Sequence, residues 1–262
     1  MTQSYIGKKT VQITEEKVCG VSLISYKIDP VYPEEEERIR PAIIILPGGA
    51  YSHKSKREGE PVALFFLSLG YHAFILDYTV GREGIENNPP EREVAFAIRH
   101  IRERSEEYKI DPEKIVLLGF SAGGHLALSS TVHNKEERAN YLVLCYPVVT
   151  MGEWGHEEST YNLTGGDEEK KSYYSIEKAI TKDFPPSFIW HTSQDKSVSV
   201  MNTIMLTEAL AKNGVDFEYH VFQKGGHGMS VCTNEVKSFN KSNQVWLSLL
   251  ASWLEENLSW EN

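Results

Sequence analysis

Hydrophobic positions along the chain fall into short apolar runs separated by longer stretches in which apolar residues recur at helical spacing. The central runs are almost continuous in Ile, Val and Leu, which is typical of strands buried on both faces of a parallel sheet. The runs predict strands at Val11–Val18, Val21–Ile28, Ala42–Leu46, Ala73–Tyr78, Ile115–Gly119, Leu142–Tyr146, Ser187–His191 and Phe217–Phe222.

The stretches between these runs predict helices. Gly70 and Gly214 follow two of them, which suits a helix stop. The predicted helices are Pro61–Leu69, Glu91–Glu107, Val200–Lys212 and Asn243–Leu258. This alternation predicts an α/β fold with a mostly parallel sheet covered by helices, whose first two strands form an antiparallel hairpin at one edge. Because neither an internal repeat nor a Ser/Gly-rich linker interrupts the pattern, we expect a single domain over residues 1–262.

Composition narrows the class of protein. The chain has 262 residues, of which 40% are hydrophobic and 24% charged, and its formal net charge is −10. That charge argues against nucleic acid or an anionic membrane as a partner, and the run Glu34–Glu37 predicts a solvated loop. Three scattered cysteines indicate a reducing compartment, and the start of the chain has no apolar signal segment. We therefore expect a cytoplasmic protein.

The segment Gly119-Phe120-Ser121-Ala122-Gly123 fits the pattern G-x-S-x-G. An apolar run precedes it and a helical pattern follows it, which is the context in which this motif presents a nucleophile. A sharp turn from strand to helix exposes the central hydroxyl and needs small neighbouring residues. Ser121 is therefore a candidate nucleophile, whereas the same five positions outside such a context are often an ordinary Gly-Ser turn.

A serine nucleophile needs a histidine base, and chain order selects among the nine histidines. His227 lies in a glycine-rich loop after the last predicted strand, from which it can reach Ser121. The others fit less well: His220 lies inside a strand, His191 comes early in the order, and polar surface or supporting roles suit His53 and His125.

The acid that orients the base is expected between the serine and the histidine in the chain. Asp195 follows the penultimate predicted strand and is the candidate, although an aspartate there can also cap the helix that follows. Asp183 and Asp216 precede strands, so they fall at the end of the sheet opposite the expected site. Asp167 lies in an earlier loop and is the second candidate for the acid.

The strand Ala42–Leu46 runs into a turn of small residues, where backbone N–H groups can stabilise a developing oxyanion. We expect the amides of Gly49, Ala50 and Ala122 to form this oxyanion hole, the first two defined to within one residue. Taken alone, the segment would be a plain Pro-Gly-Gly turn.

These segments together resemble the α/β-hydrolase superfamily, and in particular compact acetyl esterases related to the hormone-sensitive-lipase group and to xylan and sugar-ester deacetylases. The similarity extends from about Ile43 onward. The segments that carry it are Leu46–Ser52, Arg57–Pro61, Gly119–His125, His191–Asp195 with Val198, and Phe222–Gly228.

The resemblance implies an eight-stranded α/β-hydrolase fold with helices on both faces and no large lid domain. It also implies a serine carboxylesterase that hydrolyses short-acyl, above all acetyl, esters, with a sugar as a possible alcohol and without metal or organic cofactor. Pro47 and Ala50 depart from the HGGG form, and the Ala50 methyl group is expected to narrow the acyl pocket. The connection from Val148 to Pro186 is a candidate specificity segment.

Two alternatives stay open. A small amidase or peptidase would use the same Ser121, Asp195 and His227, and a catalytically silent hydrolase fold could serve as a binding protein. A homo-oligomer is also compatible with the sequence, whereas membrane and nucleic-acid partners are not expected.

Overall fold

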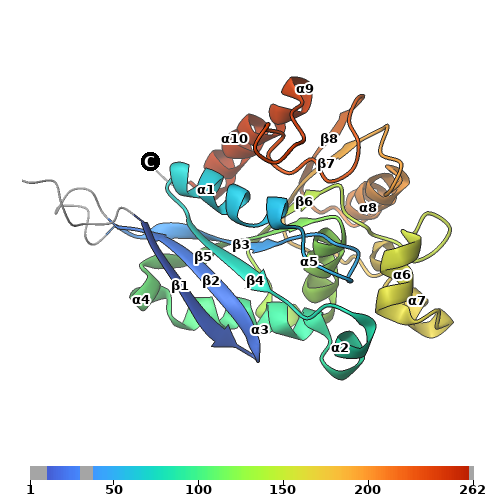
Figure 1. The fold of residues 1–262 in the computed structure, drawn as a ribbon, viewed down its shortest axis with the longest axis horizontal. Coiled ribbons are helices and arrows are strands. Elements are labelled where there is room, and N and C mark those ends of the chain that lie inside the picture. Colours follow the sequence, from blue (N-terminus) through green and yellow to red (C-terminus); the bar gives the residue numbers. More distant parts are fainter. Residues whose placement is uncertain (1–10, 30–37, 260–262) are drawn as a thin grey trace, which may run out of the picture.

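The computed structural model describes residues 11–29 and 38–259, and these hold an eight-stranded sheet in the order β1-β2-β4-β3-β5-β6-β7-β8 (Figure 1). The strands are β1 (Val11–Val18), β2 (Val21–Ile28), β3 (Arg40–Leu46), β4 (His72–Asp77), β5 (Ile110–Phe120), β6 (Tyr141–Cys145), β7 (Ser187–Thr192) and β8 (Phe217–Phe222). β1 pairs antiparallel with β2 and β2 with β4, whereas the other neighbours are parallel. The predicted mostly parallel sheet with an antiparallel edge hairpin is confirmed.

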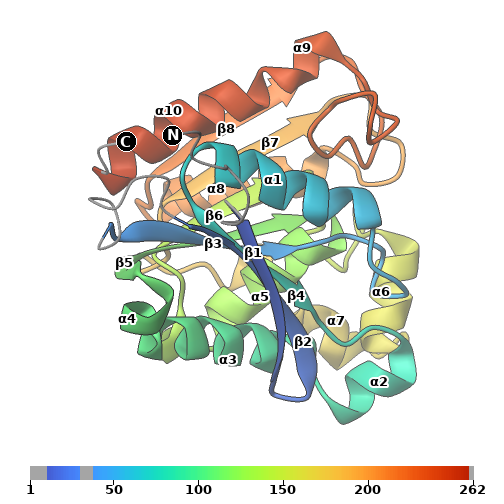
Figure 2. The same cartoon turned by 60° about the vertical axis from the view of Figure 1, so that its left-hand side comes forward.

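Helices cover both faces of this sheet (Figures 1 and 2). They are α1 (Glu60–Ser68), α2 (Arg82–Asn87), α3 (Pro90–Glu103), α4 (Ser105–Tyr108), α5 (Ala122–His133), α6 (Glu157–Thr164), α7 (Glu168–Tyr173), α8 (Met201–Lys212), α9 (Lys241–Gln244) and α10 (Trp246–Leu258). Short 3-10 turns cover Lys56–Glu58, Lys135–Glu137 and Ile176–Lys178.

Alternate residues of the central strands bury opposite sides of the sheet, as strand geometry requires. Ile44 of β3 packs in the cluster beneath α3, α5 and α8, and Ile43 packs in the cluster beneath α1 and α10. Because the strand is buried on both faces, its sequence reads as a continuous apolar run rather than an alternating one.

Two predicted helices are each divided. The predicted helix Glu91–Glu107 is interrupted at Arg104, and Asn243–Leu258 is interrupted at Val245. The spacing of apolar residues shows which face of a helix is buried, but it does not show whether the i to i−4 hydrogen bonds are continuous. A break of one residue in the helix therefore leaves the apolar spacing unchanged. The acidic run Glu34–Glu37 lies outside the described residues.

Strand register places the segments that follow β3, β5, β6, β7 and β8 at the same end of the sheet, beyond the carboxyl ends of these strands. Leu46 of β3 pairs with Gly119 of β5, so the turn after β3 starts beside the turn after β5. Cys145 of β6 pairs with Phe120, and Thr192 of β7 pairs with Phe222 of β8. The sequence-predicted site residues all leave the sheet at this end. In the described part of the chain, helices reach neither the length nor the apolar character needed to cross a bilayer.

Candidate active site

Ser121 occupies the turn between β5 and α5 with φ 53° and ψ −119°, a conformation that non-glycine residues rarely adopt. Its flanking glycines have no room for a side chain. A Cβ at Gly119 would lie 2.3 Å from the Gly123 carbonyl oxygen, and one at Gly123 would lie 2.1 Å from the Leu46 carbonyl oxygen. The turn therefore needs small residues, as the sequence predicted.

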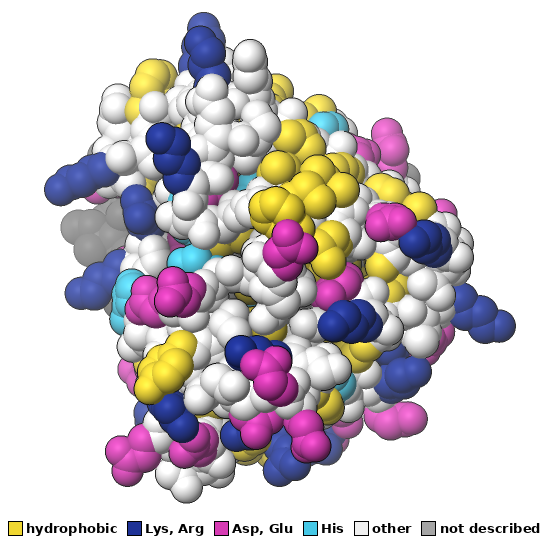
Figure 3. All heavy atoms as spheres, turned by 90° about the vertical axis from the view of Figure 1, so that its right-hand side faces the viewer, with side chains coloured by type: hydrophobic (Ala, Val, Ile, Leu, Met, Phe, Trp, Pro, Cys, Tyr) yellow, Lys and Arg dark blue, Asp and Glu magenta, His cyan; other side chains and the backbone are white. Residues whose placement is uncertain are grey.

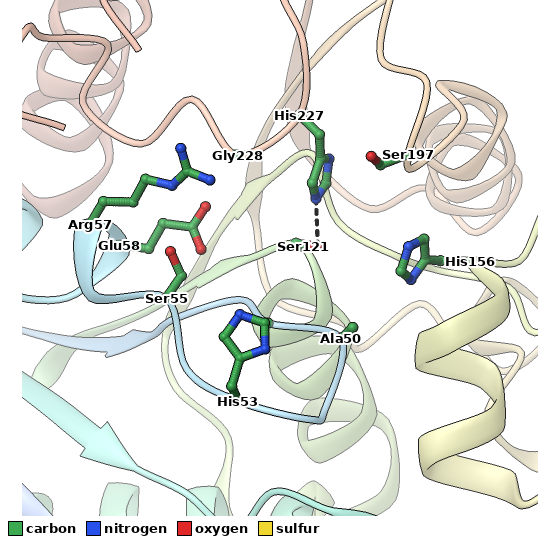
Figure 4. A pocket seen from close by; sticks show the side chains of 11 residues that line it. Ala50, His53, Ser55, Arg57, Glu58, Ser121, His156, Ser197, His227 and Gly228 are labelled. Carbon is green, nitrogen blue, oxygen red and sulfur yellow. Dashed lines mark hydrogen bonds between the residues drawn. The ribbon is translucent and has the colours of Figure 1, made fainter. Parts of the chain in front are cut away.

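His227 lies between Ser121 and Asp195. Its Nε2 is 2.7 Å from the Ser121 Oγ (Figure 4). Its Nδ1 is 2.6 Å from the Asp195 Oδ2. The serine and the aspartate thus hydrogen-bond to opposite nitrogens of one imidazole. With Nδ1–H donating to the carboxylate, Nε2 is free to accept the serine proton.

The Asp195 side chain is fully buried and its second oxygen is also satisfied. Oδ1 accepts hydrogen bonds from the backbone amides of Ser197 (2.9 Å) and Val198 (3.0 Å), so the residue also shapes the turn before α8. Burial acts to raise the pKa of the carboxyl, but hydrogen bonds from His191, His227 and the Val198 amide outweigh it. The pKa of Asp195 therefore lies well below its usual range, and the group is a carboxylate at neutral pH.

Gly49 and Ala50 lie in the turn after β3, and Ala122 opens α5. In the described part of the chain, the amides of these residues donate to no backbone oxygen. The turn closes through its carbonyls instead, because Gly49 O accepts the amides of Ser52 (2.9 Å) and His53 (3.1 Å). The amides of the predicted oxyanion hole are therefore available to a ligand.

A cleft of about 180 Å³ opens over Ser121 (Figure 4). The residues that line it carry polar groups or small side chains, and none is a large hydrophobic residue. They are Gly49, Ala50, His53, Ser55, Arg57, Glu58, Ser121, His156, Ser197, His227 and Gly228. In the space-filling view, the main gathering of exposed hydrophobic side chains lies in the upper right part of this face (Figure 3). Such a cleft suits a small polar molecule better than a long acyl chain.

Other candidates from the sequence have structural partners. His125 is fully buried, with Nδ1 2.7 Å from the Tyr51 hydroxyl, rather than at a polar surface. His191 hydrogen-bonds the Val198 carbonyl at 3.0 Å and lies 3.3 Å from Asp195, so it contacts the acid and not the serine. Asp167 caps α7, and Asp183 pairs with Arg138.

Sequence reasoning assigned no role in the site to Glu58, Tyr146 or His156. Glu58 and His156 line the cleft, and the Tyr146 ring packs edge-on against His227 with centroids 5.0 Å apart. Arg57 and Glu58 belong to a segment that carries the family resemblance, which was the one available signal for Glu58. His156 falls in the connection from Val148 to Pro186, for which the sequence predicted only a location.

Comparisons with known proteins identify similar sequences and structures. The family described as "alpha/beta hydrolase fold" matches residues 91–231, more than half of the chain, and the family described as "BD-FAE" matches residues 28–147. A solved acetyl ester-xyloside bifunctional hydrolase from Caldicellulosiruptor lactoaceticus is 33% identical with a TM-score of 0.79. The match covers 92% of this chain and 89% of that one.

Two curated relatives are longer than this chain. Endo-1,4-beta-xylanase B from Butyrivibrio fibrisolvens is 34% identical over 78% of this chain and 35% of its own length. An acetylxylan esterase from Xylanibacter ruminicola is 29% identical over 82% of this chain and 45% of its own length. The chain thus spans less than half of either relative. Because the matched family model covers more than half of the chain, including β5 to β8, and the solved relative covers nearly the whole chain, this protein belongs to the alpha/beta hydrolase fold family.

Proposed function

We propose that this protein is a serine carboxylesterase that removes short acyl groups, above all acetyl, from polar alcohols such as sugars. The observation that carries the proposal is the hydrogen-bonded chain Ser121–His227–Asp195 beneath a small polar cleft. The acetylxylan esterase and the acetyl ester-xyloside hydrolase among its relatives support the choice of acetyl and sugar.

In the proposed reaction the Ser121 Oγ attacks the ester carbonyl carbon while His227 Nε2 accepts its proton. The amides of Gly49, Ala50 and Ala122 hydrogen-bond the tetrahedral oxyanion. As the carbon–oxygen bond breaks, His227 returns the proton to the departing alcohol, leaving an acyl-serine. A water molecule, deprotonated by His227, then releases the carboxylic acid and regenerates the serine.

His156 supports a polar alcohol as the leaving group. Its Nδ1 accepts the Ser159 amide at 3.3 Å, at the N-terminus of α6. Burial, reinforced by nearby His227, lowers the pKa of His156, so the ring is neutral at pH 7 and carries its proton on Nε2. The ring lies across the cleft from Arg57 and Glu58 (Figure 4), where this N–H can donate to a substrate hydroxyl.

The test is turnover of acetylated xylose beside p-nitrophenyl acetate by the wild type and by Ser121→Ala. We expect the wild type to hydrolyse both and the variant to hydrolyse neither. We also expect His156→Ala to raise KM for the sugar acetate more than KM for p-nitrophenyl acetate. Wild-type protein that is folded but turns over neither ester would refute esterase activity. Activity on the aryl ester alone would refute the sugar assignment.

A further inference from the structure

Glu58 is a buried acid at the cleft, only 2% exposed, at the end of the 3-10 turn before α1. Its two carboxylate oxygens accept hydrogen bonds from different loops: Oε2 from the Gly48 amide at 2.9 Å and Oε1 from the Tyr146 hydroxyl at 2.8 Å. A glutamine has one acceptor oxygen and could serve only one of these donors. The pair of donors therefore calls for a carboxylate.

The first bond acts on the predicted oxyanion turn. Gly48 directly precedes Gly49 and Ala50, and its backbone is packed between Glu58 and the nucleophile. A Cβ at Gly48 would lie 2.8 Å from the Glu58 Oε2 and 2.9 Å from the Ser121 Cβ. By holding the Gly48 peptide, Glu58 sets the direction from which the next two amides leave the turn.

The second bond acts on the loop that carries His227. Tyr146 follows β6 directly, and its hydroxyl accepts the Ser230 amide at 2.8 Å while donating to Glu58. The same ring packs edge-on against the His227 imidazole. Burial, reinforced by the negative Glu58, raises the pKa of Tyr146 well above its usual value, so the phenol keeps the proton that it donates.

Resting on the proposed function, we propose that Glu58 is a positioning residue that fixes the oxyanion turn and the His227 loop relative to each other through Gly48 and Tyr146. The chain Ser230 N–H to Tyr146 O–H to Glu58 runs in one donor direction, in which each bond polarises the next. Removing the carboxylate frees both loops, so the amides and the base no longer meet the reacting atoms at their required distances.

The test compares Glu58→Ala, Glu58→Gln and Tyr146→Phe with the wild type, and uses Glu169→Gln on the exposed face of α7 as the matched control. Measurements are kcat and KM for p-nitrophenyl acetate, affinity for a trifluoromethyl ketone that adds reversibly to the serine, and the thermal midpoint. We expect kcat of Glu58→Ala to fall roughly 10- to 100-fold with KM within about threefold, and ketone affinity to fall in parallel. Glu58→Gln and Tyr146→Phe each lose only one of the two hydrogen bonds to residue 58, so their kcat and ketone affinity should fall less.

Folded Glu58→Ala with kcat and ketone affinity within about twofold of the wild type would overturn the inference. So would a drop in the thermal midpoint without a selective loss of ketone affinity, since that is the signature of a merely structural acid. If Glu58→Ala does not fold, Glu58→Gln and Tyr146→Phe decide by the same two readouts. Failure of the proposed function is a separate result, because it would appear as an inactive wild type.

Discussion

Ala50 holds a φ of 54°, a left-handed conformation that glycine adopts more easily, and its methyl group faces the cleft (Figure 4). A glycine would adopt this backbone conformation with less strain, so we expect the Ala50 methyl group to have a role, which is to limit the length of the acyl chain. Ala50→Gly removes that methyl group from a cleft of about 180 Å³. We predict a rise of roughly tenfold in the butyrate-to-acetate ratio of kcat/KM for p-nitrophenyl esters. An unchanged ratio would mean that another residue limits the acyl chain.

The residues of the site differ in how far sequence could identify them. Ser121 has a motif, and Asp195 and His227 have a fixed order relative to strands, so topology alone predicts that they meet. Beyond its place in the segment Arg57–Pro61, Glu58 has no signal in the sequence, because an acid before a helix usually lies in solvent. Its burial depends on Gly48 and Tyr146, the latter far away in the sequence, and only the assembled sheet brings those donors together.

Among the elements, the turn from β5 into α5 has little room for a larger residue. Gly123→Ala would drive a Cβ against the Leu46 carbonyl oxygen of β3, which is backbone and cannot rotate away. We predict a loss of about 2–4 kcal/mol in the free energy of unfolding, together with loss of esterase activity as Ser121 shifts. Urea unfolding checks the first value.

Gly226→Ala is the matched control for stability, since a Cβ there meets nothing within 4 Å. We expect its unfolding free energy to stay within about 0.5 kcal/mol of the wild type. Equal stability of the Gly123 and Gly226 variants would show that the contact between strand and helix is looser than its geometry indicates.

Strands were predicted more completely than helices. Strands buried on both faces leave continuous apolar runs, and each predicted run overlaps an observed strand. The helices α6 and α7 in the connection from Val148 to Pro186 were not predicted. They are short and are capped by His156 and Asp167, so their signal lies in two side chains rather than in apolar spacing.

For the whole molecule, two buried histidines make stability depend on pH. Burial, reinforced by Arg40 and Lys27, lowers the pKa of His72 to about 3, and burial lowers that of His125 to about 4. Both sites favour the neutral ring, whereas an unfolded histidine titrates at 6.5. As the pH falls below 6.5, the unfolded chain binds protons that the native protein does not, so stability decreases until the native pKa is reached.

This linkage predicts that each of the two histidines removes about 2 kcal/mol of stability between pH 6.5 and pH 5. His72 lies at the start of β4, where its Nδ1 accepts the Ile28 amide at 3.1 Å. In His72→Gln, the loss of stability from pH 7 to pH 5, measured by urea unfolding, should be smaller than in the wild type by about that amount. An identical loss would show that His72 is protonated in the native state.

The central claim is that Ser121 is a nucleophile activated by His227 and Asp195. The most direct test is the intact mass of the wild type, Ser121→Ala and His227→Ala after exposure to a fluorophosphonate. The account predicts one phosphonyl adduct on the wild type, none on Ser121→Ala, and labelling of His227→Ala slowed by several orders of magnitude. An unlabelled but folded wild type, or equal labelling of Ser121→Ala, would contradict it.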